Sequence, residues 1–130
     1  MPRLTPARSD LGVCALAICS TLAFSPAFAA DFPTGTYAAK KAPYTLSFDE
    51  KGQFHVNKGD TLEVAGSYSA KASELELTDS SGPWACTKAG EQTGTYAWKY
   101  ENAVLTFSKV ADKCEDRARS LIKLAWKAQK

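Results

Sequence analysis

The most regular feature of the chain is an alternation of apolar and polar residues in short runs from residue 34 onward. In a β-strand successive side chains point to opposite faces, so such a run gives one apolar face and one polar face. Clusters of Gly, Asp, Asn, Lys and Ser separate the runs and are typical of tight turns. The runs predict strands over about 34–40, 44–49, 53–57, 61–69, 74–78, 94–100 and 103–110.

The predicted strand over 61–69 is expected to be long and bent. Leu62 and Val64 are two residues apart, which places both on the apolar face. Gly66 lies inside this strand, where a glycine often marks a bend or a bulge.

The C-terminal segment supports two interpretations. Asp112 and Glu115 have the spacing of a capping box, which predicts a short helix from about Lys113. Beyond it, alternation over 121–128 favours a last strand, whereas apolar residues at helical spacing from Cys114 to Ala125 favour a continuing helix. We favour the strand because it would cover the open edges of the first and seventh strands.

The connections between the predicted strands are too short for parallel crossovers, so neighbouring strands must be antiparallel. The sequence therefore predicts an all-β fold, an antiparallel up-and-down meander of about eight strands with a short helix before the last. Closing the meander into a small barrel leaves no exposed edge.

A tripeptide recurs in this series, at Gly35-Thr36-Tyr37, Gly66-Ser67-Tyr68 and Gly94-Thr95-Tyr96. The first copy resembles the Gly-x-aromatic start of lipocalin-like (calycin-type) proteins. With the hairpins that follow, residues 34–128 resemble a small lipocalin-like domain of an exported bacterial protein. The resemblance implies an apolar-ligand cup in the barrel and an arginine across its closed end.

Residues 1–29 have the features of a secretory signal peptide. A basic start precedes a mostly apolar segment, and Ala27-Phe28-Ala29 has the pattern of a cleavage site. An uncleaved anchor is the alternative. The sequence therefore predicts one domain over 30–130 in a secreted or periplasmic protein without a membrane span after cleavage. Cys14 and Cys19 would leave with the signal peptide.

Two cysteines remain in the predicted domain, Cys86 and Cys114. In an exported chain an even pair is typically bridged, so we predict a disulfide between them. It would pin the longest irregular stretch, Asp79 to Thr93, to the C-terminal segment. Long loops of small domains are usually functional or pinned.

The candidate ligand-binding residues are mainly aromatic. Such side chains either fill a barrel and pack its ends or line the mouth of a pocket. Trp84, in the long loop, is either a lid over the barrel end or an anchor for a protein partner. Arg117 either lies on the helix surface and pairs with Glu115 or Asp116, or crosses the closed end of the barrel. The full set is Tyr37, Tyr68, Trp84, Tyr96, Trp98 and Arg117.

The charge of the chain and its lack of catalytic motifs make several classes of function less favoured. The formal net charge is only +2 and the charges are interspersed, which does not indicate a nucleic-acid partner. The sequence has no catalytic, metal-site or cofactor motif, so we expect neither an enzyme nor a cofactor. Our first hypothesis is an exported binding protein for a small apolar or amphipathic ligand. The alternative is a module that binds an envelope protein, such as a periplasmic hydrolase inhibitor acting through the 80–93 loop.

Overall fold

The computed structural model describes residues 32–130. The predicted signal peptide over 1–29, with Cys14 and Cys19, lies outside these residues. Within them the chain forms a run of strands interrupted once by a helix. The strands are β1 (Gly35–Ala39), β2 (Tyr44–Phe48), β3 (Gln53–Lys58), β4 (Thr61–Lys71), β5 (Glu74–Ser81), β6 (Thr93–Glu101), β7 (Val104–Ala111) and β8 (Trp126–Ala128), and the helix is α1 (Glu115–Lys123).

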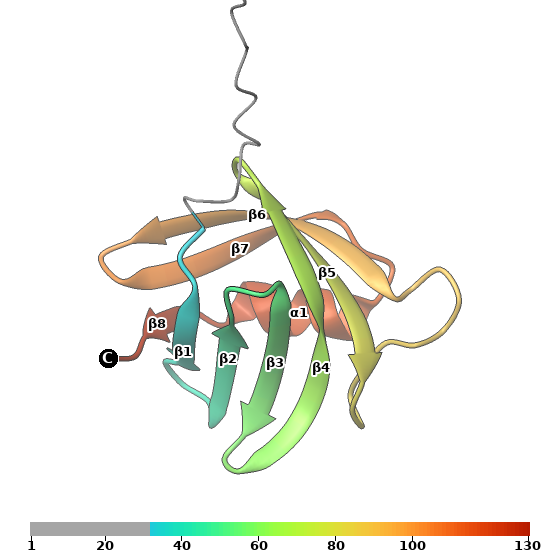
Figure 1. The fold of residues 1–130 in the computed structure, drawn as a ribbon, viewed down its shortest axis with the longest axis horizontal. Coiled ribbons are helices and arrows are strands. Elements are labelled where there is room, and N and C mark those ends of the chain that lie inside the picture. The colour runs from blue at the N-terminus through green and yellow to red at the C-terminus, as the bar shows by residue number, and fades with distance from the viewer. Residues whose placement is uncertain (1–31) are drawn as a thin grey trace, which may run out of the picture.

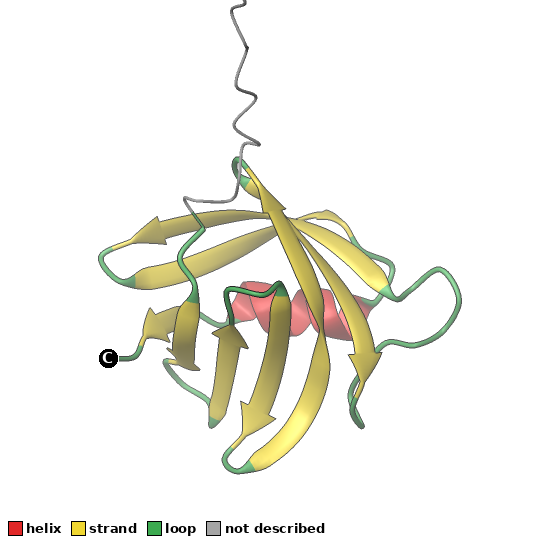
Figure 2. Cartoon of the chain, viewed as in Figure 1, coloured by secondary structure: helices red, strands yellow, loops and turns green. Residues whose placement is uncertain are grey.

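The strands form a closed antiparallel barrel in chain order, as the sequence predicted. Each strand pairs with the next along the chain, and β8 pairs with both β7 and β1. Figure 1 shows β6 and β7 crossing above β1, β2 and β3, with α1 lying behind the strands. The secondary-structure view shows the helix passing behind β2, β3 and β4, before the chain returns to β8 (Figure 2).

The core occupies the inside of the barrel and follows the predicted alternation. Leu46, Leu75 and Leu105 have no exposed surface. Phe32, ahead of β1, closes one end, with its ring centroid 4.9 Å from that of Phe48 and 5.1 Å from that of Trp98. The buried apolar residues are Phe32, Tyr37, Leu46, Phe48, Phe54, Ala70, Leu75, Leu77, Tyr96, Leu105, Phe107, Ala118, Leu121 and Trp126.

Strand β4 has two irregularities, one predicted and one not. The predicted one is at Gly66, where the β4–β5 register shifts and an added Cβ would lie 2.0 Å from the carbonyl oxygen of Thr78. The other is a bulge at Glu63: β3 pairs with Leu62 and with Val64 but offers no partner to the residue between them. The extra residue shifts the alternation, so Glu63 is buried and Leu62 is 44% exposed. The prediction that Leu62 shares the inward face with Val64 is therefore wrong.

The C-terminal segment combines the two interpretations of its sequence. Helix α1 runs to Lys123, further than we predicted, and the last strand is limited to Trp126–Ala128. Ala118 and Leu121 lie on the buried face of α1, whereas Ile122 is 43% exposed. Three residues are enough for β8 to close the barrel, because each of its edges finds a partner.

The predicted capping box is wrong. Cys114 is the N-cap of α1 and makes no side-chain capping hydrogen bond. Glu115 and Asp116 stand in the first turn, where negative charge interacts favourably with the helix dipole. Asp112 is buried and pairs elsewhere. Between residues 32 and 130 no helix has the length and apolar character needed to cross a membrane.

The assignment of Leu105 to the core and of Leu62 to the surface predicts that the same substitution, leucine to alanine, costs very different amounts of stability at the two positions. Leu105→Ala should lower the free energy of unfolding by about 2–5 kcal/mol, because it leaves a cavity in the barrel. Leu62→Ala is the matched control and should cost less than about 1 kcal/mol, since this side chain is half exposed. Urea denaturation measures both, and equal losses would contradict the core assignment.

Candidate functional site

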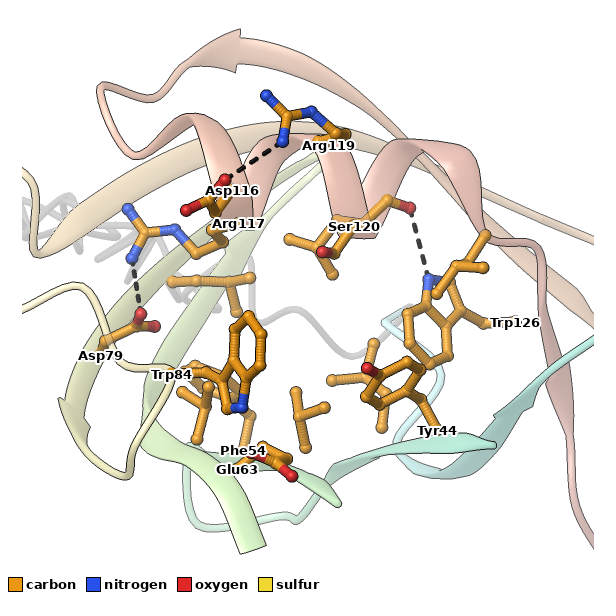
Figure 3. A pocket seen from close by; sticks show the side chains of 16 residues that line it. Tyr44, Phe54, Glu63, Asp79, Trp84, Asp116, Arg117, Arg119, Ser120 and Trp126 are labelled. Carbon is orange, nitrogen blue, oxygen red and sulfur yellow. Dashed lines mark hydrogen bonds and ion pairs between the residues drawn. The ribbon is translucent and has the colours of Figure 1, made fainter. Parts of the chain in front are cut away.

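A pocket of about 270 Å³ opens at the end of the barrel away from Phe32. It lies between the inward faces of β2, β3, β4 and β5, helix α1 and the 82–92 loop (Figure 3). Most of its lining is apolar. The lining residues are Tyr44, Leu46, Phe54, Val56, Glu63, Val64, Leu77, Asp79, Trp84, Asp116, Arg117, Arg119, Ser120, Leu121, Leu124 and Trp126.

The pocket has a buried floor and an aromatic rim. Leu46 and Leu77 on the floor are at most 1% exposed. On one side Trp126 is held by its indole N–H, which donates to the carbonyl of Leu121 at 3.3 Å. Trp84 stands on the opposite side and is 66% exposed (Figure 3). The combination gives an apolar interior walled on one side by the buried indole of Trp126, with the exposed indole of Trp84 at the entrance.

Local backbone contacts fix the position of Trp84. Gly82 has φ of +113°, a conformation that favours glycine, and an added Cβ there would lie 2.2 Å from the carbonyl oxygen of Glu63. The loop can therefore lie directly against β4. The Trp84 amide then donates to that same carbonyl at 3.1 Å. Two residues further on, the Cys86 disulfide anchors the loop to the start of α1.

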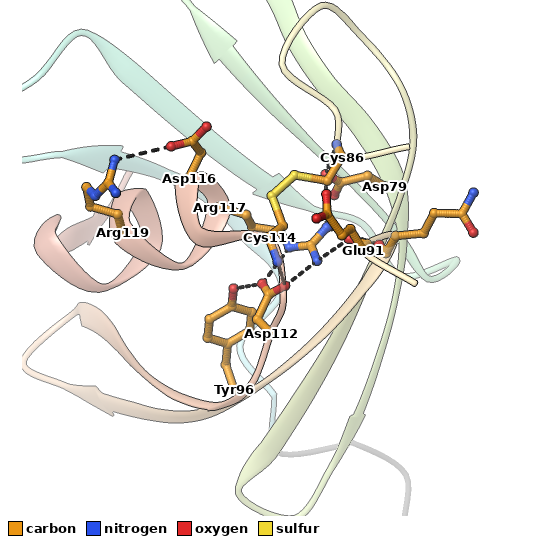
Figure 4. The surroundings of a disulfide bond; sticks show 10 residues. Asp79, Cys86, Glu91, Tyr96, Asp112, Cys114, Asp116, Arg117 and Arg119 are labelled. Atoms are coloured by element: carbon orange, nitrogen blue, oxygen red, sulfur yellow. Dashed lines mark hydrogen bonds and ion pairs between the residues drawn. A yellow bond between two sulfur atoms is a disulfide. The ribbon is translucent and has the colours of Figure 1, made fainter. Parts of the chain in front are cut away.

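Behind the pocket, Arg117 forms a buried ionic network (Figure 4). Its guanidinium donates to Asp112 at 2.7 and 2.6 Å and lies 3.0 Å from the carboxylate of Asp79. It also donates to the carbonyls of Glu91 and Gln92 at 2.9 and 3.0 Å. The side chains of the three charged residues are at most 7% exposed. One side chain thus connects α1, β5, the end of β7 and the 82–92 loop.

The disulfide and this network support each other. The Cα atoms of Cys86 and Cys114 are 6.3 Å apart and joined by the predicted bridge. The amide of Cys86 donates to Asp79 and that of Cys114 donates to Asp112, both at 2.8 Å. Each half-cystine therefore holds one of the two carboxylates that bind Arg117.

Burial and hydrogen bonding shift the pKa values of Asp112 and Tyr96 in this network. Burial raises the pKa of Asp112, but hydrogen bonds from Arg117, Tyr96 and the Cys114 amide outweigh it and leave the pKa below its usual value. For Tyr96, burial and the hydrogen bond to Asp112 both raise the pKa, so the hydroxyl stays protonated. The network therefore contains two carboxylates, one guanidinium and one neutral phenol.

Of the predicted ligand-binding residues, Trp84 and Arg117 line the pocket. Tyr37 and Tyr96 are fully buried in the barrel core, and Tyr68 and Trp98 pack around Phe32 at the other end. The interpretation that these four line a pocket mouth does not hold for this pocket, because they fill the barrel and pack its closed end. Burial raises the pKa of Tyr37 to about 12.

Three residues of this region were not found from the sequence. Asp79 lies inside β5 and Asp112 directly follows β7, and only the pairing with Arg117 distinguishes them from other acids of the chain. Glu63 stands between the apolar Leu62 and Val64 in the sequence and reaches the pocket through the bulge. Within residues 32–130 no group of three His, Cys, Asp or Glu side chains is placed to hold a metal ion.

No protein-family model, curated protein or solved structure matches this chain.

The network predicts that Arg117, which belongs to it, is far more sensitive to substitution than Arg119, which does not. Arg117→Lys keeps the charge, but an ammonium with three donors cannot reproduce the contacts that the guanidinium makes with four different residues. We therefore expect a loss of about 2 kcal/mol or more in unfolding free energy. Arg119→Lys is the control, since Arg119 makes only an exposed pair with Asp116 at 3.2 Å and should change little. Urea denaturation at neutral pH distinguishes them, and an Arg117→Lys variant as stable as the parent would show that the network is dispensable.

The lowered pKa of Asp112 predicts acid sensitivity. A carboxyl whose pKa is lower in the folded than in the unfolded state stabilises the protein above its unfolded pKa of about 3.9. This stabilisation is lost as the pH falls through the folded pKa. Below about pH 4 the unfolding free energy should therefore fall less steeply in Asp112→Asn than in the parent. Asp116→Asn, at an exposed carboxyl, should keep the parent slope in the same urea titrations. Equal slopes for Asp112→Asn and the parent would contradict the assignment.

Proposed function

We propose that this chain is an exported binding protein for a small apolar or amphipathic ligand, which it holds in the pocket at the open end of the barrel. The observation that carries the proposal is the pocket itself, a concave site of about 270 Å³ with a mostly apolar lining and a few polar groups at its edge. Ligand sites in proteins typically have this character.

The size of the pocket limits the ligand. Sites for drug-sized molecules span roughly 300–1,000 Å³, so this pocket, at about 270 Å³, is slightly smaller than that range. A short acyl or alkyl chain or a single aromatic group would fit between Leu46, Leu77 and Leu121. A longer ligand would leave part of itself outside, beside the exposed Trp84.

The rigidity of the walls supports binding at low entropic cost. The barrel is closed, and α1 and the 82–92 loop are fixed by the disulfide and by Arg117. A site that is already formed does not have to be ordered by its ligand, which favours affinity. The disulfide also agrees with an oxidising compartment, as the predicted signal peptide requires.

A pocket-filling substitution tests the proposal. Leu124→Trp adds a large ring to a residue that lines the pocket and should abolish the binding of octanol, a small amphipathic probe, in equilibrium dialysis. Ile122→Trp adds the same ring two residues away at an exposed position of α1 and should bind like the parent. Thermal unfolding of both variants checks that they are folded.

The proposal fails if the parent protein binds none of a series of short-chain alcohols and aromatic compounds. It also fails if Leu124→Trp binds octanol as well as the parent does, because the binding would then lie elsewhere.

A protein-binding role is the second candidate, favoured by the exposure of Trp84 in a pinned loop. Exposed tryptophans are frequent anchors of protein interfaces. The same pocket-filling variant separates the roles, because Leu124→Trp fills the pocket yet leaves Trp84 accessible. Loss of a binding activity in Trp84→Ala but not in Leu124→Trp would favour the protein partner.

A further inference from the structure

The charged side chains around the pocket differ in the number of ion-pair and hydrogen-bond partners that they have. Arg117 is held by two carboxylates and two backbone carbonyls, and Arg119 pairs with Asp116. Arg117 is therefore not available for an anionic ligand without breaking a buried ion pair, and the pair made by Arg119 is exposed to solvent. Glu63, which also lines the pocket, makes no ion pair or side-chain hydrogen bond with any residue between 32 and 130.

The position of Glu63 gives meaning to its lack of a side-chain partner within residues 32–130. The residue is only 8% exposed and stands among apolar neighbours such as Phe54 and Val64. Its carboxylate oxygens are not among the fully buried unpartnered atoms of residues 32–130, so they keep accessible surface and can meet a donor or a cation from elsewhere. The bulge in β4 creates this arrangement, since in a regular strand Glu63 would face solvent. Bulges that redirect a side chain are frequent beside functional sites.

The groups near Glu63 favour a cation. The amide of Trp84 donates to the carbonyl of Glu63, which holds the exposed indole beside this residue (Figure 3). Tyr44, Phe54 and Trp126 add further aromatic rings to the same lining. The faces of aromatic rings attract cations, and Trp is the strongest of them.

We propose that the pocket takes an amphipathic ligand with a protonated amine. Its ammonium group donates to Glu63 and contacts the Trp84 ring at the entrance, and its apolar part lies on the floor between Leu46 and Leu77. This specification rests on the proposed function and adds the chemical class of the ligand. A short alkylamine or arylalkylamine fits the volume, and it is charged at neutral pH because alkylammonium groups titrate near pH 10, like lysine.

The test compares three probes that share one tail, octylamine, octanol and octanoate, by equilibrium dialysis at neutral pH. Octylamine should bind about tenfold or more tightly than octanol, because it forms a hydrogen bond between charged partners. Octanoate should bind more weakly than octanol, since its carboxylate would meet Glu63.

Two variants place the effect at one side chain. In Glu63→Gln the affinity for octylamine should fall about tenfold while that for octanol stays within about twofold. Glu76→Gln, which removes an exposed charge from β5, should bind all three probes like the parent. The thermal midpoint of ligand-free Glu63→Gln should equal or exceed that of the parent, because no contact of the folded chain is lost.

The outcomes separate this inference from the function on which it rests. If none of the three probes binds, the proposed function fails. If octanol or octanoate binds as tightly as octylamine, the pocket is a ligand site but the amine specificity is wrong. A Glu63→Gln protein that no longer folds would show that the carboxylate is structural and would overturn the inference, as would an unchanged preference for octylamine in that variant.

Discussion

The buried guanidinium of Arg117 is the interaction on which the open end of the barrel depends. It joins the start of α1 and the end of β7 to β5 and the 82–92 loop, and its two carboxylate partners are themselves fixed by the amides of the half-cystines. Removing a charge from water is costly, and here the cost is offset by short hydrogen bonds from every side. The strands alone would define a ring, but the helix and the loop that shape the pocket are placed by this residue.

The alternation of side chains predicted the barrel well because it reflects a simple requirement. Strands with one apolar face must bury it, and a closed meander does so without leaving an edge. Leu46, Leu75 and Leu105 stand at alternating apolar positions of three predicted strands and have no exposed surface in the barrel. The Gly66 irregularity was also predictable, because a glycine weakens a regular strand and is typically found where the strand bends or bulges. The disulfide followed from the count of cysteines and the predicted export.

The pocket was harder to predict because its lining depends on a bulge, on the length of a helix and on long-range packing, which a single sequence hardly indicates. One additional residue in β4 reverses the face of Glu63, and nothing in the alternation of Leu62 and Val64 marks it. The extent of α1 depended on whether Leu121 packs on a helix face or on a strand face, and both patterns were present. Phe32 lies outside every periodic run, so its role in closing the barrel became visible only in three dimensions. The tyrosines predicted to bind ligand are those that this closure and the core require.

The pairing of β1 with β8 also determines when the fold can form. Tyr37 lies opposite Ala128, so the ring stays open until both of these segments are available. Contacts between residues so far apart in sequence close a large loop and form slowly, unlike the hairpins between successive strands. Until then β1 and β7 each present an unpaired edge. The hairpins can therefore form in order along the chain, but the barrel itself can close only when β8 joins them.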